Sequence, residues 1–98
     1  MAHVYMLKCS DGSYYVGSTR DLDQRLRQHD IGLGASYTRT RQPVELVWSF
    51  ETERVTEAYA LERQIHGWSR AKREALIRGD FDGLSRLSQR RGGRPRSH

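Results

Sequence analysis

Two features missing from this 98-residue sequence are long apolar runs and a second cysteine. No stretch approaches the roughly 20 consecutive apolar residues that cross a bilayer. The N-terminus has no charged region followed by an apolar stretch, so we expect neither a membrane protein nor a signal peptide. The single cysteine, Cys9, excludes an internal disulfide and a multi-cysteine zinc site. This cysteine usage is typical of a reducing compartment, and we expect a cytoplasmic protein.

Acidic residues are scarce at the C-terminal end. The chain has 17 Lys/Arg and 12 Asp/Glu, but residues 83–98 contain no acid, whereas the two signs balance over residues 1–82. The final stretch RRGGRPRSH lacks apolar residues, which favours disorder. We therefore predict one folded domain over residues 1–88 and a basic disordered tail over residues 89–98. Such a tail adds non-specific attraction to phosphate or simply keeps the protein in solution.

The order of local patterns predicts a small α/β (α+β) fold. Strand-forming residues occupy 2–9, 13–18 and 44–50, and helical periodicity follows the second and third of these segments. The expected order is β-β-α-β-α-α-α, with helices packed on a small sheet. Residues 35–43 are expected to form a polar loop. The residues expected to begin helices are Asp21, Thr56 and Ser69, and those expected to end or break them are Gly32, Gly34, Gly67 and Gly79.

Tyr5 and Tyr15 lie on either side of the first predicted turn, and the loop length decides whether they share a face. A two-residue Asp-Gly loop puts them on opposite faces of the hairpin. A three-residue Ser-Asp-Gly loop, residues 10–12, puts them on the same face, with Gly12 in the left-handed conformation. The residue types favour the three-residue loop. Ordinary aromatic packing also accounts for two tyrosines on one sheet face.

Three charged or titratable residues lie beside apolar positions of the predicted helices. Arg25 and His29 have i, i+4 spacing and lie on one side of their helix, as residues of a solvated face also do. Glu62 lies at the edge of an apolar stripe, where an unpaired carboxylate is costly. Glu62 therefore needs a cation, which is either an arginine such as Arg25 or a metal ion.

These residues together resemble the GIY-YIG nuclease domain. The resemblance rests on Val4-Tyr5, on Tyr15-Val16-Gly17, and on Arg25, His29 and Glu62 in that order. The stretches CSDGSYYVGST, DLDQRLRQH, SYTRTRQPVELVW and ALERQIHGWSRAKREALIRGD resemble the small stand-alone bacterial members. The resemblance covers residues 3–82. It implies a three-stranded antiparallel sheet flanked by helices, and a metal-dependent endonuclease that hydrolyses DNA phosphodiester bonds in repair or recombination.

The resemblance also implies roles for particular residues. Tyr5 and Tyr15 would line the site, with Tyr5 helping to activate the attacking water. Arg25 would hold the scissile phosphate, because a guanidinium presents a fixed charged fork to phosphate. Glu62 would hold one Mg²⁺ or Mn²⁺ ion. Supporting roles in proton transfer or phosphate contact would fall to His29 and Tyr37.

The sequence departs from the family pattern at three points. His3 and Val4 replace the first glycine and the isoleucine of the name motif, the chain has no asparagine, and His66 stands where we expect lysine. No additional DNA-binding domain is recognisable, so we expect weak, non-specific DNA binding or targeting by a protein partner. The alternative is a nucleic-acid-binding or repair-protein docking module that keeps the fold without significant catalysis. Exposed apolar surface around Trp48 and Trp68 would favour docking.

Overall fold

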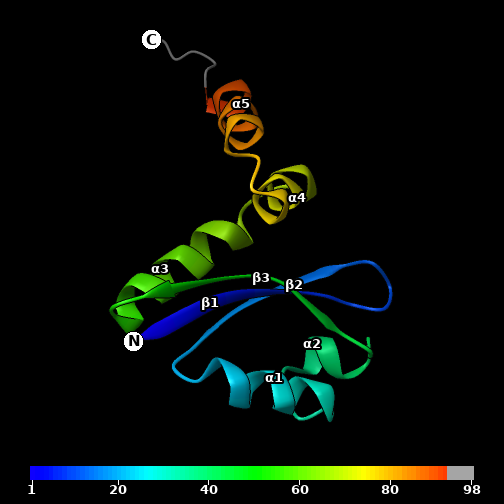
Figure 1. Ribbon diagram of the computed structural model, residues 1–98. Helices are drawn as coiled ribbons and strands as arrows, with labels where there is room; N and C mark the ends of the chain where they lie inside the picture. Colours follow the sequence, from blue (N-terminus) through cyan, green and yellow to red (C-terminus); the bar gives the residue numbers. More distant parts are fainter. Residues whose placement is uncertain (93–98) are drawn as a thin grey trace. The chain divides into compact units, whose positions relative to one another are not determined.

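The structure is a computed structural model that describes the backbone of residues 1–92 and the side chains of residues 1–87. Its contacts divide the chain into two units, Met1–His66 and a second unit that begins at Gly67. The first unit contains β1 (Ala2–Lys8), β2 (Tyr14–Thr19), α1 (Leu22–Asp30), α2 (Ser36–Arg39), β3 (Glu45–Thr52) and α3 (Val55–His66), and the second contains α4 (Arg70–Arg78) and α5 (Phe81–Gly92) (Figure 1). Within the described residues, no helix has the length and apolar character that a membrane span requires.

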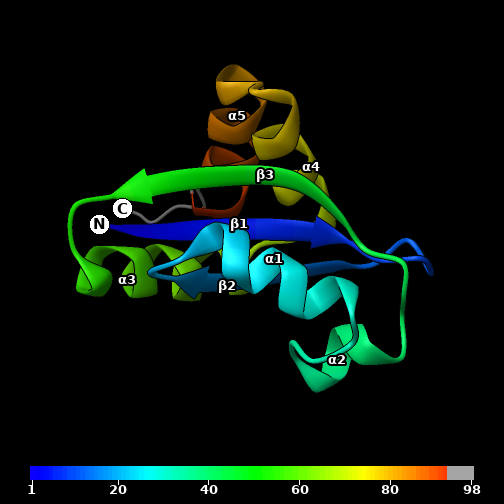
Figure 2. The same cartoon turned by 60° about the horizontal axis from the view of Figure 1, so that its bottom comes forward.

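The first unit is built on a three-stranded antiparallel sheet of order β2-β1-β3, as predicted. Helices α1 and α2 lie on one face of this sheet and α3 lies on the other (Figures 1 and 2). The central strand β1 is buried on both faces, because Val4, Tyr5, Met6 and Leu7 all have 0% exposure. Since side chains alternate along a strand, Tyr5 and Leu7 point to one face and Val4 and Met6 to the other.

The hairpin confirms the three-residue loop. Leu7 is opposite Tyr15 in the register of β1 and β2. The Cys9 N–H donates to the Ser13 carbonyl at 2.8 Å, which closes the loop, and Gly12 has φ +86°. Tyr5 and Tyr15 therefore share one face of the sheet, and Gly17 stands directly opposite Tyr5.

Several predicted helix ends are confirmed. Asp21 caps α1 by accepting a hydrogen bond from the Gln24 N–H at 3.1 Å. Ser69 caps α4 by accepting one from the Lys72 N–H at 3.2 Å. Gly79 ends α4 with φ +72°, in the left-handed conformation that glycine adopts without strain.

Two local predictions are wrong. The α3 helix begins at Val55, so Thr56 lies in its first turn and is not its cap. Instead the Glu57 carboxylate accepts a hydrogen bond from the Arg54 N–H at 3.2 Å, which satisfies a donor that precedes the helix. The segment expected as a polar loop contains the single helical turn α2, and its residue Thr38 is fully buried.

The second unit begins its last helix at an unpredicted cap. The Asp80 carboxylate accepts a hydrogen bond from the Gly83 N–H at 2.9 Å. From there α5 continues to Gly92 and so includes the first four residues of the predicted tail, 89–92. Residues 93–98 of that tail lie outside the described residues, so the disorder expected there stays a prediction.

Candidate active site

The centre of the candidate site is the phenol oxygen of Tyr5, on the face of the sheet that α1 covers. This oxygen lies 3.0 Å from Nε2 of His29 and accepts a hydrogen bond from Nε of Arg25 at 3.4 Å. Tyr5 and His29 are both fully buried. The i, i+4 spacing of Arg25 and His29 therefore brings both side chains to one atom of β1, so their helix face is not simply solvated.

Two glycines make this close approach possible. A Cβ atom on Gly17 would lie 2.5 Å from the Tyr5 oxygen and 2.7 Å from its ring carbon Cζ. A Cβ atom on Gly34 would overlap the imidazole ring of His29. Both glycines are therefore required by space, since any side chain there would displace the Tyr5–His29 pair.

Aromatic rings extend the site from the sheet toward α2. The ring centroid of Tyr15 lies 6.3 Å from that of Tyr5 and 5.4 Å from that of His29. Tyr37 of α2 stacks on Tyr15, with centroids 6.1 Å apart. The Arg41 guanidinium lies 3.9 Å from the centroid of the Tyr37 ring. The fold thus brings the predicted residues Tyr15 and Tyr37 together in one wall beside the phenol.

The same guanidinium ties this wall to the hairpin loop. Arg41 forms a 3.0 Å ion pair with Asp11, and its backbone carbonyl accepts a hydrogen bond from the Ser10 N–H at 3.0 Å. Its Nη1 donates to the Tyr37 carbonyl at 2.9 Å. Arg41 therefore fixes the position of Tyr37 relative to β1 and β2.

Burial shifts the pKa values of Tyr5 and His29 in the directions that favour their uncharged forms. Burial raises the pKa of Tyr5, and the charges of Tyr15 and Glu62 add to this effect, although the hydrogen bond from Arg25 opposes it. Burial and the neighbouring charge of Arg25 lower the pKa of His29. At neutral pH the structure therefore holds a protonated phenol beside a neutral imidazole. Arg25 does not by itself provide the lowered tyrosine pKa that a free phenolate would require.

Glu62 projects from α3 and is held by two partners. Ser18 of β2 donates a hydrogen bond to Oε1 at 2.6 Å, and Nε2 of His66 lies 3.3 Å from Oε2. The side chain is 20% exposed. Among the described residues, Glu62 forms no ion pair with Arg25, whose guanidinium instead donates to Tyr5 and to Gln28. Of the two cations considered for Glu62, the arginine is therefore not its partner.

The number and type of possible protein ligands near Glu62 limit which metal ions could bind there. No group of three or more His, Cys, Asp or Glu side chains capable of holding a metal occurs in the described part of the chain. A zinc site needs three or four such protein ligands. Mg²⁺ takes one or two carboxylates and completes its shell with water and phosphate oxygens. The single carboxylate of Glu62 thus fits Mg²⁺ or the similarly hard Mn²⁺.

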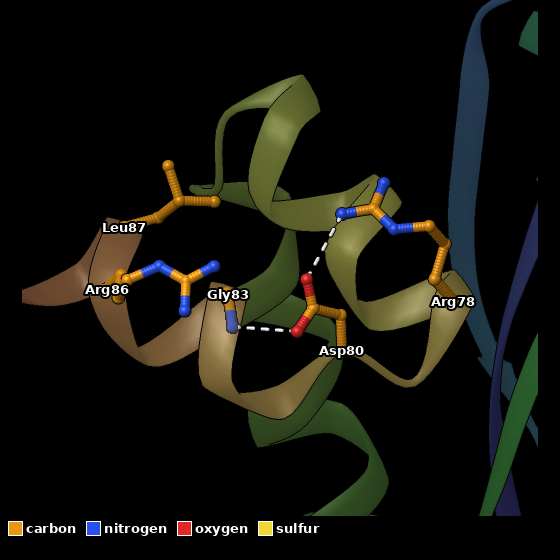
Figure 3. Close-up of a pocket in the computed structure, with 5 residues that line it drawn as sticks. All are labelled: Arg78, Asp80, Gly83, Arg86 and Leu87. Atoms are coloured by element: carbon orange, nitrogen blue, oxygen red, sulfur yellow. Dashed lines mark hydrogen bonds and ion pairs between the residues drawn. The ribbon is translucent and has the colours of Figure 1, made fainter.

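A separate concavity lies in the second unit. It has a volume of about 320 Å³, and its lining residues are Arg78, Asp80, Gly83, Arg86 and Leu87 (Figure 3). The Asp80 carboxylate caps α5 and lies 3.5 Å from Nη2 of Arg78 (Figure 3). The hydrogen bond from the Gly83 N–H lowers the pKa of Asp80. This carboxylate has a structural role, and the concavity contains none of the predicted site residues.

Sequence analysis missed three polar residues around the site: Ser18, Thr38 and Gln42. Thr38 Oγ1 lies 2.9 Å from Nδ1 of His29. The Gln42 side-chain amide donates to the carbonyl oxygens of His29, at 2.5 Å, and of Thr38, at 3.1 Å. Ser18 follows the name motif directly and could have been suspected. Nothing in the pattern of residues 35–43 indicated that a helical turn there places Thr38 next to His29.

Comparison with known proteins reveals relatives of this chain. The family model of the GIY-YIG catalytic domain matches residues 1–75. A UPF0213 protein of Halobacterium salinarum is 46% identical over 77 residues, covering 79% of this chain and all of that protein. The solution NMR structure of a UPF0213 protein from Bacillus halodurans superimposes with a TM-score of 0.53 at 39% identity, covering 90% of this chain and 98% of that one. The solution NMR structure of a protein from E. faecalis has a TM-score of 0.51 at 28% identity, covering 98% of this chain and 92% of that one.

The matched region contains every residue of the predicted site. The name-motif tyrosines, the two α1 residues and the α3 carboxylate all lie within residues 1–75. Family match, close relatives and site geometry thus point the same way, and the chain belongs to the GIY-YIG nuclease family.

Proposed function

We propose that this protein is a metal-dependent endonuclease that hydrolyses phosphodiester bonds in DNA. The observation that carries the proposal is the Tyr5 phenol oxygen, which lies between a guanidinium donor, Arg25, and an imidazole nitrogen of His29. Phosphoester hydrolysis needs a cation for the phosphate and a route for the proton of the attacking water. Arg25 supplies the first, and the Tyr5–His29 pair supplies the second.

In this proposal Arg25 binds the scissile phosphate. Its guanidinium comes from α1, is partly buried, and already reaches the phenol through Nε and Gln28 through Nη1. These contacts orient the planar group before any substrate binds. Phosphate oxygens suit such an oriented guanidinium because it presents several N–H donors in one plane. The scissile phosphorus is thereby held near the Tyr5 oxygen.

In this proposal the attacking water gives its proton to the hydrogen-bonded Tyr5–His29 pair and not to a free phenolate. As the water oxygen bonds to phosphorus, its proton moves to the Tyr5 oxygen and the Tyr5 proton moves to His29 Nε2. The bond from phosphorus to the leaving DNA oxygen breaks, and that oxygen takes a proton from solvent. The products are a phosphate monoester and a hydroxyl end, with His29 protonated until it releases its proton. The raised pKa of Tyr5 is compatible with this route, because no phenolate accumulates.

Glu62 is the residue that would hold one divalent cation, Mg²⁺ or Mn²⁺. Ser18 orients its carboxylate through the 2.6 Å hydrogen bond to Oε1. A cation held there would polarise a phosphoryl oxygen and stabilise the leaving oxygen. Nε2 of His66 lies 3.3 Å from the other carboxylate oxygen, Oε2.

Charge distribution supports DNA as the substrate. Residues 1–66 carry a net charge of −1, whereas residues 67–98 carry +6. The second unit and the end of the chain therefore supply attraction to the phosphate backbone, which is independent of sequence and weakens with salt. We expect weak, non-specific DNA binding or targeting by a protein partner, and a cytoplasmic location in a repair or recombination pathway.

A docking module is the second candidate function. The rings of Trp48 and Phe50 stack with centroids 6.3 Å apart on β3, which is an edge strand, and Phe50 is 53% exposed. A partly exposed aromatic pair of this kind is a common anchor for a protein partner. This function, or simple nucleic-acid binding, requires neither Glu62 nor Arg25 to act on a phosphate.

Nicking of supercoiled plasmid separates these functions. Wild type, Glu62→Ala and the exposed control Glu53→Ala are purified identically and assayed with Mg²⁺, Mn²⁺ or excess chelator. We expect cation-dependent nicking by wild type and Glu53→Ala, and none by a folded Glu62→Ala. Equal nicking by all three would contradict the assigned site. Absence of nicking by wild type, with DNA still bound, would favour the binding module.

A further inference from the structure

We propose that Thr38 is a positioning residue that fixes the tautomer of His29, so that Nδ1 carries the proton and Nε2 accepts the phenol proton of Tyr5. Its role in cleavage rests on the proposed function. The hydrogen-bond assignment itself is a property of the folded chain and can be measured without DNA.

The directions of three hydrogen bonds lead to this assignment. The hydroxyl of Thr38 donates to the carbonyl oxygen of Ala35 at 3.0 Å, and a carbonyl can only accept. With its one proton used there, Thr38 Oγ1 faces His29 Nδ1, 2.9 Å away, as an acceptor. Nδ1 must then carry a hydrogen. In the neutral imidazole Nε2 has none, so it accepts from the Tyr5 hydroxyl 3.0 Å away.

The groups facing His29 agree with a neutral ring. They are Tyr5 from β1, Tyr15 from β2, and Arg25 and Asp30 from α1. Arg25 opposes a second positive charge, and Asp30 favours one less strongly. His29 is also fully buried, which disfavours the charged form.

The residues around Thr38 are suited to holding it in place. The absence of a side chain at Gly34 leaves room for the His29 ring. The Gln42 amide bonds the carbonyl oxygens of both His29 and Thr38, and so joins the end of α1 to α2. Thr38 itself is fully buried. The α2 turn, which the sequence did not predict, thus holds Thr38 against His29. Outer hydrogen-bond partners orient the ligands of metal sites in the same way.

The test combines ring NMR with cleavage. Nitrogen-15 shifts and ring proton couplings of His29 report which nitrogen is protonated in the full chain at neutral pH. The variants are Thr38→Val, which keeps the shape but removes the hydroxyl, Thr38→Ser, which restores it, and the control Thr56→Val, at an exposed position of α3.

We expect an Nδ1–H tautomer in wild type, Thr38→Ser and Thr56→Val. In Thr38→Val we expect the proton to move to Nε2 in a substantial fraction of molecules. The nicking rate constant should then fall by roughly 10- to 100-fold, the range typical of second-layer partners, with little change in KM. If Thr38→Val does not fold, the spectra of wild type and Thr38→Ser still decide the assignment.

The outcomes separate this inference from the proposed function. An Nε2–H tautomer in wild type, or an unchanged tautomer and rate in Thr38→Val, would overturn the positioning role. A changed tautomer with an unchanged cleavage rate would also overturn it. The expected tautomers in a wild type that cleaves no DNA would support the hydrogen-bond assignment and overturn the proposed function.

Discussion

The hydroxyl oxygen of Tyr5 lies 3.0 Å from Nε2 of His29, although 24 residues separate them in the sequence. One residue is in the central strand and the other is in the last turn of α1, and both are fully buried. Buried polar groups are normally paired, so this contact alone could be structural. The guanidinium of Arg25 donates to the same oxygen, so in the proposed function a proton route and a phosphate-binding cation would meet at one atom.

Cleavage should require neutral His29. Because its pKa is lowered from the ordinary value of about 6.5, the cleavage rate should stay level from neutral pH to below 6.5 and fall only as pH drops through the lowered pKa of His29. A pH–rate profile under single-turnover conditions, beside an NMR titration of His29, provides the measurement. A rate that rises as pH decreases through the His29 titration would contradict a basic role for this residue.

The same shift affects stability. An unfolded chain binds a proton at His29 more readily than the folded one, so the free energy of unfolding should increase with pH up to about 6.5. The gain is fully present above that value and is lost as pH falls toward the lower, folded pKa. Urea unfolding at several pH values measures this dependence. Stability independent of pH between 5 and 6.5 would contradict a buried, neutral His29.

Arg25→Ala should reduce cleavage by roughly 10²- to 10³-fold, the effect typical of removing one donor that stabilises charge in a transition state. The matched control is Arg27→Ala, on the same helix and exposed, which should change the rate little beyond a general weakening of DNA attraction. Plasmid nicking rates at saturating protein compare the two. Equal losses in both variants would indicate a general charge effect rather than a phosphate site at Arg25.

Gly17→Ala should damage the site more than the fold. The new Cβ would lie 2.5 Å from the Tyr5 oxygen, so the phenol must move, at a cost of about 1–3 kcal/mol. Gly12→Ala is the control, because it strains a left-handed residue by about 1–2 kcal/mol but meets no atom within 4 Å. Thermal unfolding and nicking are measured on both. We expect similar losses of stability and a large loss of cleavage in Gly17→Ala alone.

Local patterns predicted the parts of the fold that depend on short-range chemistry. The Ser-Asp-Gly loop determined the hairpin register, and the caps Asp21 and Ser69 formed as expected, because each rests on hydrogen bonds between residues three or four positions apart. Thr56 is not the cap because the helix begins one residue before it, at Val55, and Glu57 bonds the Arg54 N–H from inside the first turn. A competition between neighbouring polar residues is not decided by pattern alone.

The sequence predicted a set of candidate site residues but not the hydrogen-bond network around them. The family resemblance predicted the phenol of Tyr5, the guanidinium of Arg25 and the carboxylate of Glu62 as site groups. The partners of those groups depend on tertiary contacts: Ser18 meets Glu62 across 44 positions, and Thr38 meets His29 through a helical turn with no sequence signature. Burial of Tyr5 and its raised pKa also depend on packing, since β1 is covered on both faces.

The most direct test of the account is the single-turnover nicking rate of Tyr5→Phe. The substitution keeps the ring and removes the hydroxyl shared by Arg25 and His29, at a stability cost of about 1–3 kcal/mol for the unpaired imidazole nitrogen. Tyr59→Phe is the matched control, because Tyr59 is 52% exposed on α3.

We predict that Tyr5→Phe remains folded and loses roughly 10²- to 10⁴-fold in rate, the range for removal of a group in general acid–base catalysis, whereas Tyr59→Phe is unaffected. If a folded Tyr5→Phe nicked plasmid at the wild-type rate, this would contradict the central claim that the Tyr5 phenol accepts the proton of the attacking water.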